Sequence, residues 1–307
     1  MREAGLEVEV DGAGNLVGRL RGRDASLPEV WSGSHLDSVP RGGRFDGALG
    51  VVAALEAVER VGVRERTLAV VAFRAEETGC NGSRARVGAG GLPGAFVEVH
   101  VEQGPVLESA GAPLGVVTGV VGIARGEVTF EGRAGHAGTT PMDARDDALC
   151  TAAEFVLALR EAARHVEGAV ATVGRLEVEP GAANVIPARV RLVYDVRAPD
   201  DARLDEVLTA AFSRPSYRTK PARFTGAPAE ALRAEIASLE LPLVEVPSGA
   251  GHDAAILAGA GVPAAMLFVR SLNGGASHSP DEHSSAEDVA LAIDVLAGTL
   301  GRLATAP

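Results

Sequence analysis

The chain has 307 residues, of which 46% are hydrophobic, and its formal net charge at pH 7 is -12. This hydrophobic content is enough for a sizeable core, and the acidic excess argues against a nucleic-acid partner, whose phosphates require a basic surface. No apolar run reaches the roughly 20 residues of a membrane span, and the first residues lack the hydrophobic region of a signal peptide, so we expect a cytoplasmic protein without a membrane partner.

Apolar runs alternate with helical patterns in the first third of the chain. Buried strands are predicted at 27–33, 67–73 and 95–101. Between the first two, residues 47–62 show apolar positions at the i, i+3, i+4 and i+7 spacing of an amphipathic helix. Strands that are buried on both faces and alternate with helices indicate an α/β sheet.

The pattern changes near residue 118. Alternating residues predict a strand at 123–132, and a long helical pattern follows at 143–166. Two more strands are predicted at 169–179 and 188–198, followed by a helix at 201–212. This order of strand, helix, two strands and helix is typical of a small antiparallel sheet covered by two helices.

The α/β style resumes in the last part of the chain. Helices are predicted at 227–239, 252–261 and 285–303, and a buried strand at 263–269. The fold class that we predict is therefore α/β, with a mixed-sheet catalytic domain that has helices on both faces and is interrupted by an inserted α+β domain. The catalytic domain would comprise 1–117 and 228–307, and the inserted domain 118–227.

Four clusters of residues that can bind metals each follow a predicted strand. They are His35, Asp37 and Asp46 in GSHLDSVPRGGRFDG, Glu76 and Glu77 in FRAEETG, His100 in HVEQG, and His278 in GGASHSP. Ligand sites in open α/β sheets lie outside the carboxyl ends of the strands, so all four clusters can converge there.

A polar turn, an anion-binding loop and a metal site compete to explain the first cluster. A single histidine at a strand end is more often structural, and the loop lacks the Lys-Ser/Thr of a P-loop. Convergence of four clusters favours a metal site. Cys80 and Cys150 are expected to be buried thiols, and imidazole and carboxylate ligands without thiolate suit zinc, manganese, cobalt or nickel. Five ligands with one shared carboxylate suit two ions about 3.5–4 Å apart.

With these residues in view, the chain resembles the M20 metallopeptidase superfamily, as a shortened member of its amidase/hydantoinase/carbamoylase branch. That branch includes N-carbamoyl-L-amino acid hydrolases, beta-ureidopropionase and allantoate amidohydrolase. The resemblance rests on blocks in the family's order: GSHLDSVPRGGRFDGALGV, FRAEE, HVEQGPVLE, GRAGHAGTTPMDARDDAL, GAANVIPARV, the DVR at 195–197, SGAGHDA and SHSPDEHS. HVEQGPVLE and GHAGTTPM distinguish the branch from ordinary M20 peptidases.

The resemblance implies a cofactor of two divalent metal ions. The ligands that it implies are Asp46 as the bridge, His35 and His100 for one ion, and Glu77 and His278 for the other. Glu76 would be the general base, which takes a proton from water and delivers it to the leaving nitrogen. Asp37, two residues beyond His35, is placed to orient that imidazole.

The inserted domain resembles the family's lid, which also forms the dimer interface, so a homodimer is expected. The resemblance implies that His136 and Asn184 reach an active site across the dimer and stabilise the oxyanion. Arg197 would hold a substrate carboxylate and Gln103 would contact the ureido or amide group. His252, with Asp253, would either touch the substrate or cap the helix that begins there.

The implied reaction is hydrolysis of a linear amide C–N bond in a small substrate with a carboxylate, either an N-carbamoyl (ureido) L-amino acid or an allantoate-like compound. Two alternatives stay open: an N-acyl amino acid deacylase or dipeptidase of the same superfamily, and a non-catalytic relative that binds a ligand or partner. The chain departs from the family pattern before GSHLD and at 78–99 and 198–247, which are short. The link at 78–99 leaves little room for the usual helices.

Overall fold

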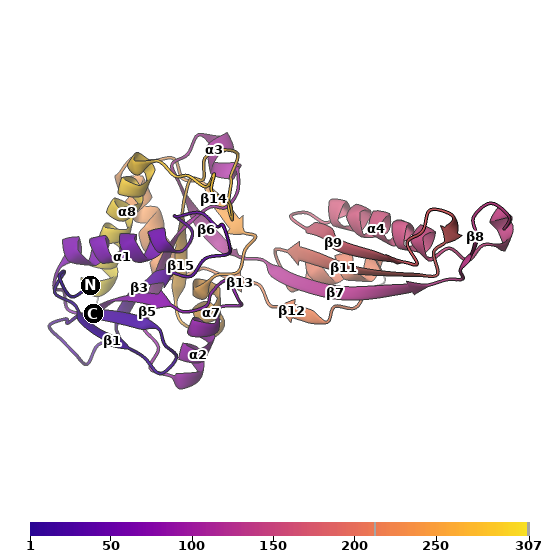
Figure 1. Cartoon of the computed structure of the whole chain (residues 1–307). Coiled ribbons are helices and arrows are strands. Elements are labelled where there is room, and N and C mark those ends of the chain that lie inside the picture. The colour runs from indigo at the N-terminus through magenta and orange to yellow at the C-terminus, as the bar shows by residue number, and fades with distance from the viewer. Residues whose placement is uncertain (212, 306–307) are drawn as a thin grey trace. The chain divides into compact units, whose positions relative to one another are not determined.

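The computed structural model describes residues 1–211 and 213–305 (Figure 1). The chain divides into two compact units. Unit 1 is made of Met1–Val120 and Ala222–Pro307, and unit 2 is Val121–Pro221, which interrupts unit 1 in the sequence. No helix in the described part of the chain combines the length and the apolar character that crossing a membrane requires.

A nine-stranded mixed sheet forms the centre of unit 1 within the described residues. The strand order is β1-β2-β4-β3-β5-β15-β6-β13, and β14 pairs with β6. The bounds are β1 (Glu7–Val10), β2 (Leu16–Leu20), β3 (Val30–His35), β4 (Leu68–Phe73), β5 (Ala95–Val101), β6 (Leu114–Val120), β13 (Ala222–Arg223), β14 (Glu245–Ser248) and β15 (Ala264–Val269). The central strands β4, β3, β5 and β15 run parallel, so their carboxyl ends meet at one edge of the sheet.

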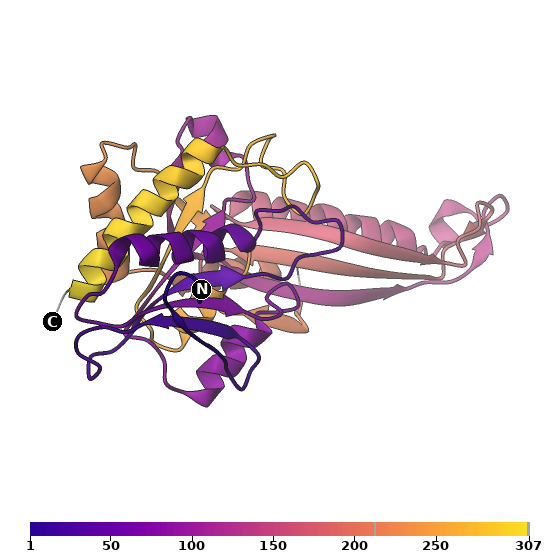
Figure 2. The same cartoon turned by 60° about the vertical axis from the view of Figure 1, so that its left-hand side comes forward.

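Helices cover both faces of this sheet (Figure 1, Figure 2). One face packs against α1 (Ala48–Val61), α6 (Ala227–Ser238) and α8 (Ala286–Thr305), and the other against α2 (Asn81–Ala89) and α7 (Asp253–Gly259). The short α3 (Val106–Ala110) follows β5.

Strand β4 shows why the central strands read as continuous apolar runs. Val70 belongs to the first core and Val71 to the second, because side chains alternate across a strand. Both faces are therefore buried, and every residue of β3, β4, β5 and β15 is buried.

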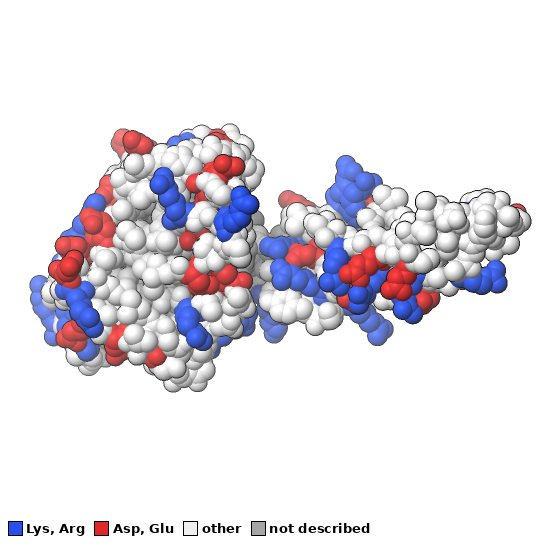
Figure 3. Space-filling view, in the orientation of Figure 1, with Lys and Arg blue, Asp and Glu red and all other residues white. Residues whose placement is uncertain are grey.

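Unit 2 contains a four-stranded antiparallel sheet in the order β12-β7-β11-β9. One face of it packs on two helices, with Leu192 of the sheet, Leu159 and Leu204 in a shared core. The opposite face carries ion pairs between neighbouring strands, such as Arg191 with Glu177, and Figure 3 shows basic and acidic side chains interspersed over it. The bounds are β7 (Gly122–Glu131), β8 (Gly135–His136), the 3-10 helix η1 (Met142–Ala144), α4 (Ala148–His165), β9 (Val170–Glu179), β10 (Val185–Ile186), β11 (Arg189–Ala198), α5 (Asp201–Ala210) and β12 (Tyr217–Thr219).

The predicted fold class, a mixed α/β sheet with helices, is confirmed. The predicted helix at 143–166 begins only at 148, because the Asp147 side chain accepts the backbone N–H groups of Leu149 and Cys150 and ends the preceding turn. Residue 212, at the end of another predicted helix, lies outside the described residues.

Three details of the sequence prediction need correction. The link at 78–99 contains the nine-residue helix α2, so glycine-rich sequence did not exclude a helix. The hairpin of β1 and β2 was not predicted, although Glu-Val-Glu-Val alternates as a strand does. Cys150 is exposed on α4, whereas Cys80 is buried as expected.

Candidate metal centre

The parallel strands of unit 1 bring the predicted ligands to one edge of the sheet. Three of the four clusters belong to the carboxyl ends of β3, β4 and β5, and the fourth follows β15. In chain order the residues are His35 at the end of β3, Asp46 just before α1, Glu76 and Glu77 after β4, His100 near the end of β5, and His278 in the loop between β15 and α8.

Two groups of potential metal ligands share Asp46. The groups are His35, Asp46 and His100, and Asp46, Glu77 and His278, and the ligand atoms of each lie within 4.8 Å of one another. Asp46 directs one oxygen to each group: Oδ1 lies 3.1 Å from Nε2 of His100, and Oδ2 lies 3.2 Å from Nε2 of His278. Oε2 of Glu77 lies 3.7 Å from the same His278 nitrogen.

Backbone carbonyls orient the two buried imidazoles. Nδ1 of His35 lies 2.9 Å from the carbonyl oxygen of Asp37, and Nδ1 of His100 lies 2.9 Å from that of Val101. A carbonyl oxygen only accepts hydrogen bonds, so each Nδ1 carries a hydrogen and donates it. The Nε2 atoms, which lie 3.5 Å apart, face Asp46 and are the nitrogens that could bind a metal ion.

Unsatisfied carboxylate oxygens fit a divalent cation. Oδ1 of Asp46 and Oε1 of Glu77 are buried and accept no hydrogen bond from a described residue. Buried carboxylate oxygens that lack a hydrogen bond are costly, and a cation bound by these oxygens and the Nε2 atoms would remove that cost. The donor set of imidazole nitrogens and carboxylate oxygens is the one that zinc and its neighbours accept.

Carboxylates and imidazoles shift one another's pKa values at this centre. Burial alone would raise the pKa of Asp46, but the nearby imidazoles of His100, His35 and His278 lower it to about 2. Burial likewise opposes the charged form of His100, but the carboxylates of Asp46 and Glu98 raise its pKa to about 9. A cation bound through Nε2 of His100 would compete with the proton on that ring.

Glu76 lies beside both groups without belonging to either. Its Oε2 atom is 3.8 Å from Nε2 of His35, and its Oε1 atom accepts a weak hydrogen bond of 3.5 Å from the Cys80 thiol. Burial, with the charge of Glu98, raises the pKa of Glu76 to about 8. The group is a carboxyl whose affinity for a proton suits proton transfer near neutral pH.

Asp37 acts through two different groups, its backbone carbonyl and its side-chain carboxylate. Its carbonyl oxygen holds His35, while its carboxylate lies 3.8 Å from Nδ1 of that ring. The carboxylate oxygens accept the backbone N–H groups of Glu76 and Glu77, each at 3.2 Å. Asp37 thus connects the segment after β3 to the segment after β4.

The model of peptidase family M20/M25/M40 matches residues 31–302. The chain is a member of this family. An N-carbamoyl-L-amino acid amidohydrolase of Geobacillus stearothermophilus is 38% identical, over 99% of this chain and 88% of that protein, and an allantoate amidohydrolase of Bacillus subtilis (strain 168) is 32% identical over 99% and 88%. The crystal structure of an amidase of the hydantoinase/carbamoylase family from Burkholderia multivorans is similar with a TM-score of 0.87 at 33% identity, over 100% of this chain and 88% of that one.

The alignments also measure how short this M20 member is. The alignment to the Geobacillus protein spans 364 positions, whereas the chain has 307 residues, so at least 57 residues of that relative have no counterpart here. The two groups nevertheless contain all five residues that were predicted as metal ligands.

Two predicted substrate-binding residues of the M20 chain lie at the centre. Nε2 of Gln103 is 3.3 Å from Oδ2 of Asp46 and 3.5 Å from Nε2 of His278, and its backbone has a left-handed φ of 58°. His252 is only 2% exposed, bonds to Ser248 through Nε2 and packs its ring 4.6 Å from that of His100. It supports a proposed ligand and forms no side-chain cap of α7.

The other predicted functional residues lie in unit 2. Pairing of β8 with β10 brings His136 and Asn184 together, and both are exposed. Nδ1 of His136 accepts the backbone N–H of Gly138 at 3.0 Å, so the hydrogen of the neutral ring lies on Nε2 and can be donated. Nε of Arg197, on β11, donates to Asp195 at 2.8 Å.

Glu98 was missed by sequence reasoning. It is fully buried in β5, accepts a hydrogen bond from Ser34 at 2.7 Å and one from the backbone of Ala254 at 2.8 Å, and so connects β3, β5 and α7 behind the ligands. A charged residue within the apolar run AFVEVHV was the signal that could have identified it.

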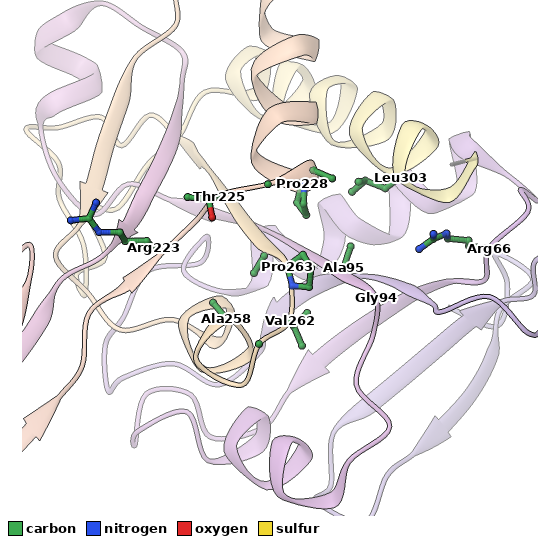
Figure 4. A pocket seen from close by; sticks show the side chains of 14 residues that line it. Arg66, Gly94, Ala95, Arg223, Thr225, Pro228, Ala258, Val262, Pro263 and Leu303 are labelled. Carbon is green, nitrogen blue, oxygen red and sulfur yellow. The ribbon is translucent and has the colours of Figure 1, made fainter. Parts of the chain in front are cut away.

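A separate cavity of about 440 Å³ opens at the other end of the strands that carry His100 and precede His278 (Figure 4). It is lined by Ala95 and Ala264, the first residues of β5 and β15, and by side chains such as Arg66 and Pro228. Since these strands carry the candidate ligands at their opposite ends, this cavity belongs to another part of unit 1.

Proposed function

We propose that the chain is a binuclear metal-dependent amidohydrolase that cleaves the linear C–N bond of an N-carbamoyl (ureido) L-amino acid or an allantoate-like substrate. The observation that carries the proposal is the pair of ligand groups that share Asp46, with the Glu76 side chain, which is 10% exposed, beside them. The relatives' names, an N-carbamoyl-L-amino acid amidohydrolase and an allantoate amidohydrolase, support this substrate class.

The donor atoms support two ions of zinc, manganese, cobalt or nickel. His35 and His100 would hold one ion and Glu77 and His278 the other, with one oxygen of Asp46 directed to each. Bound ions would supply Lewis-acid polarisation of the scissile carbonyl and a lower pKa of the attacking water.

Glu76 carries the proton in this proposal. Its carboxylate accepts a proton from the attacking water as oxygen bonds to the carbamoyl carbon, and it delivers that proton to the nitrogen as the C–N bond breaks. Water is consumed, and the products are the free amino acid and carbamate, which yields ammonia and carbon dioxide. The burial of Glu76 supports this role because it favours the protonated form that the second step needs.

The remaining residues are proposed to bind the substrate. Nε2–H of His136 and the Asn184 amide would donate to the oxyanion, and Arg197 would pair with the substrate carboxylate. Gln103 presents an amide close to Asp46 that could contact the ureido group. His252 would act through His100, against which it packs.

We also propose that unit 2 forms a homodimer, through which a second copy supplies His136 and Asn184. Two features of unit 2 support this. Strand β9 is an edge strand of its sheet, and α4 exposes Leu149 and Leu157 on its surface. A sedimentation measurement that finds only monomers at micromolar concentration would contradict the dimer.

The test is ammonia release by the protein after loading with Zn²⁺, Mn²⁺, Co²⁺ or Ni²⁺. The panel would contain N-carbamoyl-L-amino acids with different side chains and allantoate, beside N-acetyl and N-formyl amino acids and dipeptides. Turnover confined to the ureido compounds supports the proposal. Turnover of the acyl compounds or dipeptides alone would show a deacylase or dipeptidase, and binding without turnover would show a non-catalytic relative.

A further inference from the structure

The loop between β15 and α8 contains a buried carboxylate that the proposed reaction does not use. Glu282 lies four residues beyond His278 and is 4% exposed. Its Oε1 atom accepts two backbone hydrogen bonds, from N–H of Phe45 at 2.8 Å and from N–H of Asp46 at 3.0 Å. One oxygen of Glu282 therefore binds two successive backbone N–H groups, that of the shared ligand Asp46 and that of the residue before it.

Neighbouring contacts fix the same two segments to each other. The rings of Phe45 and His283 meet edge to face with centroids 5.8 Å apart. A Cβ atom added to Gly43 would lie 2.1 Å from Oε1 and 2.5 Å from Cβ of Glu282. The backbone at residue 43 is therefore so close to the Glu282 side chain that only glycine fits there.

These contacts join the segment that carries Asp46 to the loop that carries His278. Oδ2 of Asp46 and Nε2 of His278 lie 3.2 Å apart, yet both residues sit outside regular secondary structure. Loops hold geometry less well than strands, so a separate device is needed to keep these two atoms at metal-binding distance. His35 and His100, in contrast, lie on the adjacent strands β3 and β5.

We propose that Glu282 is a positioning residue that clasps the Asp46 segment to the His278 loop and so sets the affinity of the second cation, the one held by Asp46, Glu77 and His278. The inference rests on the proposed function for the presence of two cations. The first cation, held by His35, His100 and Asp46, depends on strand pairing and is affected less. Removing a supporting hydrogen bond of this kind costs about 10–100-fold in metal affinity.

The experiment titrates the metal-free full chain with Co²⁺, followed by calorimetry and by the visible absorption of the bound ion. Glu282→Ala is expected to weaken the second binding step about 10–100-fold and to weaken the first step much less. A His278→Ala variant identifies which step belongs to that group. Glu282→Gln should restore the second step, because both N–H groups bond to a single oxygen that an amide carbonyl can replace.

Asp11 offers a matched control. Its Oδ1 atom also accepts two backbone N–H groups, from Ala13 and Asn15, both at 2.9 Å, in a turn that carries no candidate ligand. Asp11→Ala should lower thermal stability without changing either Co²⁺ affinity. Gly43→Ala is a second route to the same question, since it displaces the Glu282 side chain without removing it.

The proposal is overturned if Glu282→Ala and Gly43→Ala both bind two Co²⁺ ions with the affinities of the unmodified chain. Equal weakening of both steps, accompanied by lower stability of the metal-free protein, would also overturn it, because that result describes a general loss of structure. An unmodified chain that binds two ions but releases no ammonia from any ureido compound contradicts the proposed function alone. The two failures are therefore distinguishable.

Discussion

Gly47 provides the sharpest check of the geometry at the centre. It precedes α1 with φ 65° and ψ -52°, and a Cβ atom added to it would lie 2.4 Å from Cε1 and Nδ1 of His35. Ordinary contact begins near 3.4 Å, so in Gly47→Ala the ring would have to move by about 1 Å. That movement would break the bond from Nδ1 to the carbonyl of Asp37 and turn Nε2 away from Asp46.

Gly47→Ala should have two effects, a loss of folding stability and a loss of metal affinity, and a control variant can separate them. A non-glycine residue in this backbone conformation costs about 1–3 kcal/mol, and loss of the imidazole's orientation costs about 10–100-fold in metal affinity. Gly62, at the other end of α1, also has φ 65° but has no atom within 4 Å of an added Cβ. Gly62→Ala should therefore lose stability alone.

Two assays decide the matter. Denaturant unfolding of the metal-free proteins should show a loss of about 1–3 kcal/mol for both variants, with a larger loss for Gly47→Ala if the ring cannot move freely. Calorimetric titration with Zn²⁺ should show weaker binding only for Gly47→Ala. If Gly47→Ala binds Zn²⁺ as tightly as Gly62→Ala does, the close approach of Gly47 to His35 does not control the ligand and the reasoning is refuted.

Three further predictions follow from the site. Glu76→Gln should keep its bound cations but lose about 10²–10⁴-fold in turnover, and equal ammonia release by this variant and the unmodified chain would exclude Glu76 as the base. Because the pKa of His100 is raised to about 9, metal binding below that pH should release a proton and weaken as pH falls. Calorimetry in buffers of different ionisation enthalpy measures the proton release. A metal affinity that does not change with pH would contradict this prediction. In the metal-free protein the pKa of Glu76 rises from 4.5 to about 8, so its protonation stabilises the fold below pH 4.5 and this contribution is lost as pH rises through 8. As pH rises across that window, the free energy of unfolding of Glu76→Gln should increase relative to that of the unmodified chain, by up to about 5 kcal/mol. If the difference between the two proteins is the same at pH 5 and at pH 8, the raised pKa of Glu76 is refuted.

Sequence patterns predicted the four parallel strands β3, β4, β5 and β15, which are buried on both faces, but did not predict β6 or β14 of the same sheet. A run such as LAVVAF has no polar residue, and its side chains are buried in two cores on opposite faces of the sheet. In an α/β fold such a run is typical of a central strand. The hairpin of β1 and β2 lies at the sheet edge with β1 largely exposed, so its hydrophobic signal is weak. Helix α2 has few apolar residues and only Gly82 and Ser83 buried, which is why periodicity did not reveal it.

The convergence of the candidate ligands could also be predicted, since parallel strands place their carboxyl ends at one edge. What the sequence could not provide was the atom through which each neighbour acts. Asp37 was expected to orient His35, and the structure places its backbone carbonyl, not its carboxylate, against the ring. His252 lies in the block SGAGHDA, which resembles the family pattern, but only the structure shows that its ring is buried against the ring of His100.

Glu98 and Glu282 show why supporting residues are harder to find than ligands. Each accepts hydrogen bonds from backbone N–H groups far away in the chain: Ala254 is 156 residues from Glu98, and Phe45 is 237 residues from Glu282. Every residue except proline offers such a group, so the partner position carries no characteristic side chain and nothing in the sequence marks the pair. Metal ligands, in contrast, need particular side chains at both ends of each interaction. A sequence therefore indicates the side chains that could bind a cation more clearly than the hydrogen bonds that position them. Those hydrogen bonds nevertheless contribute to how tightly a cation is held.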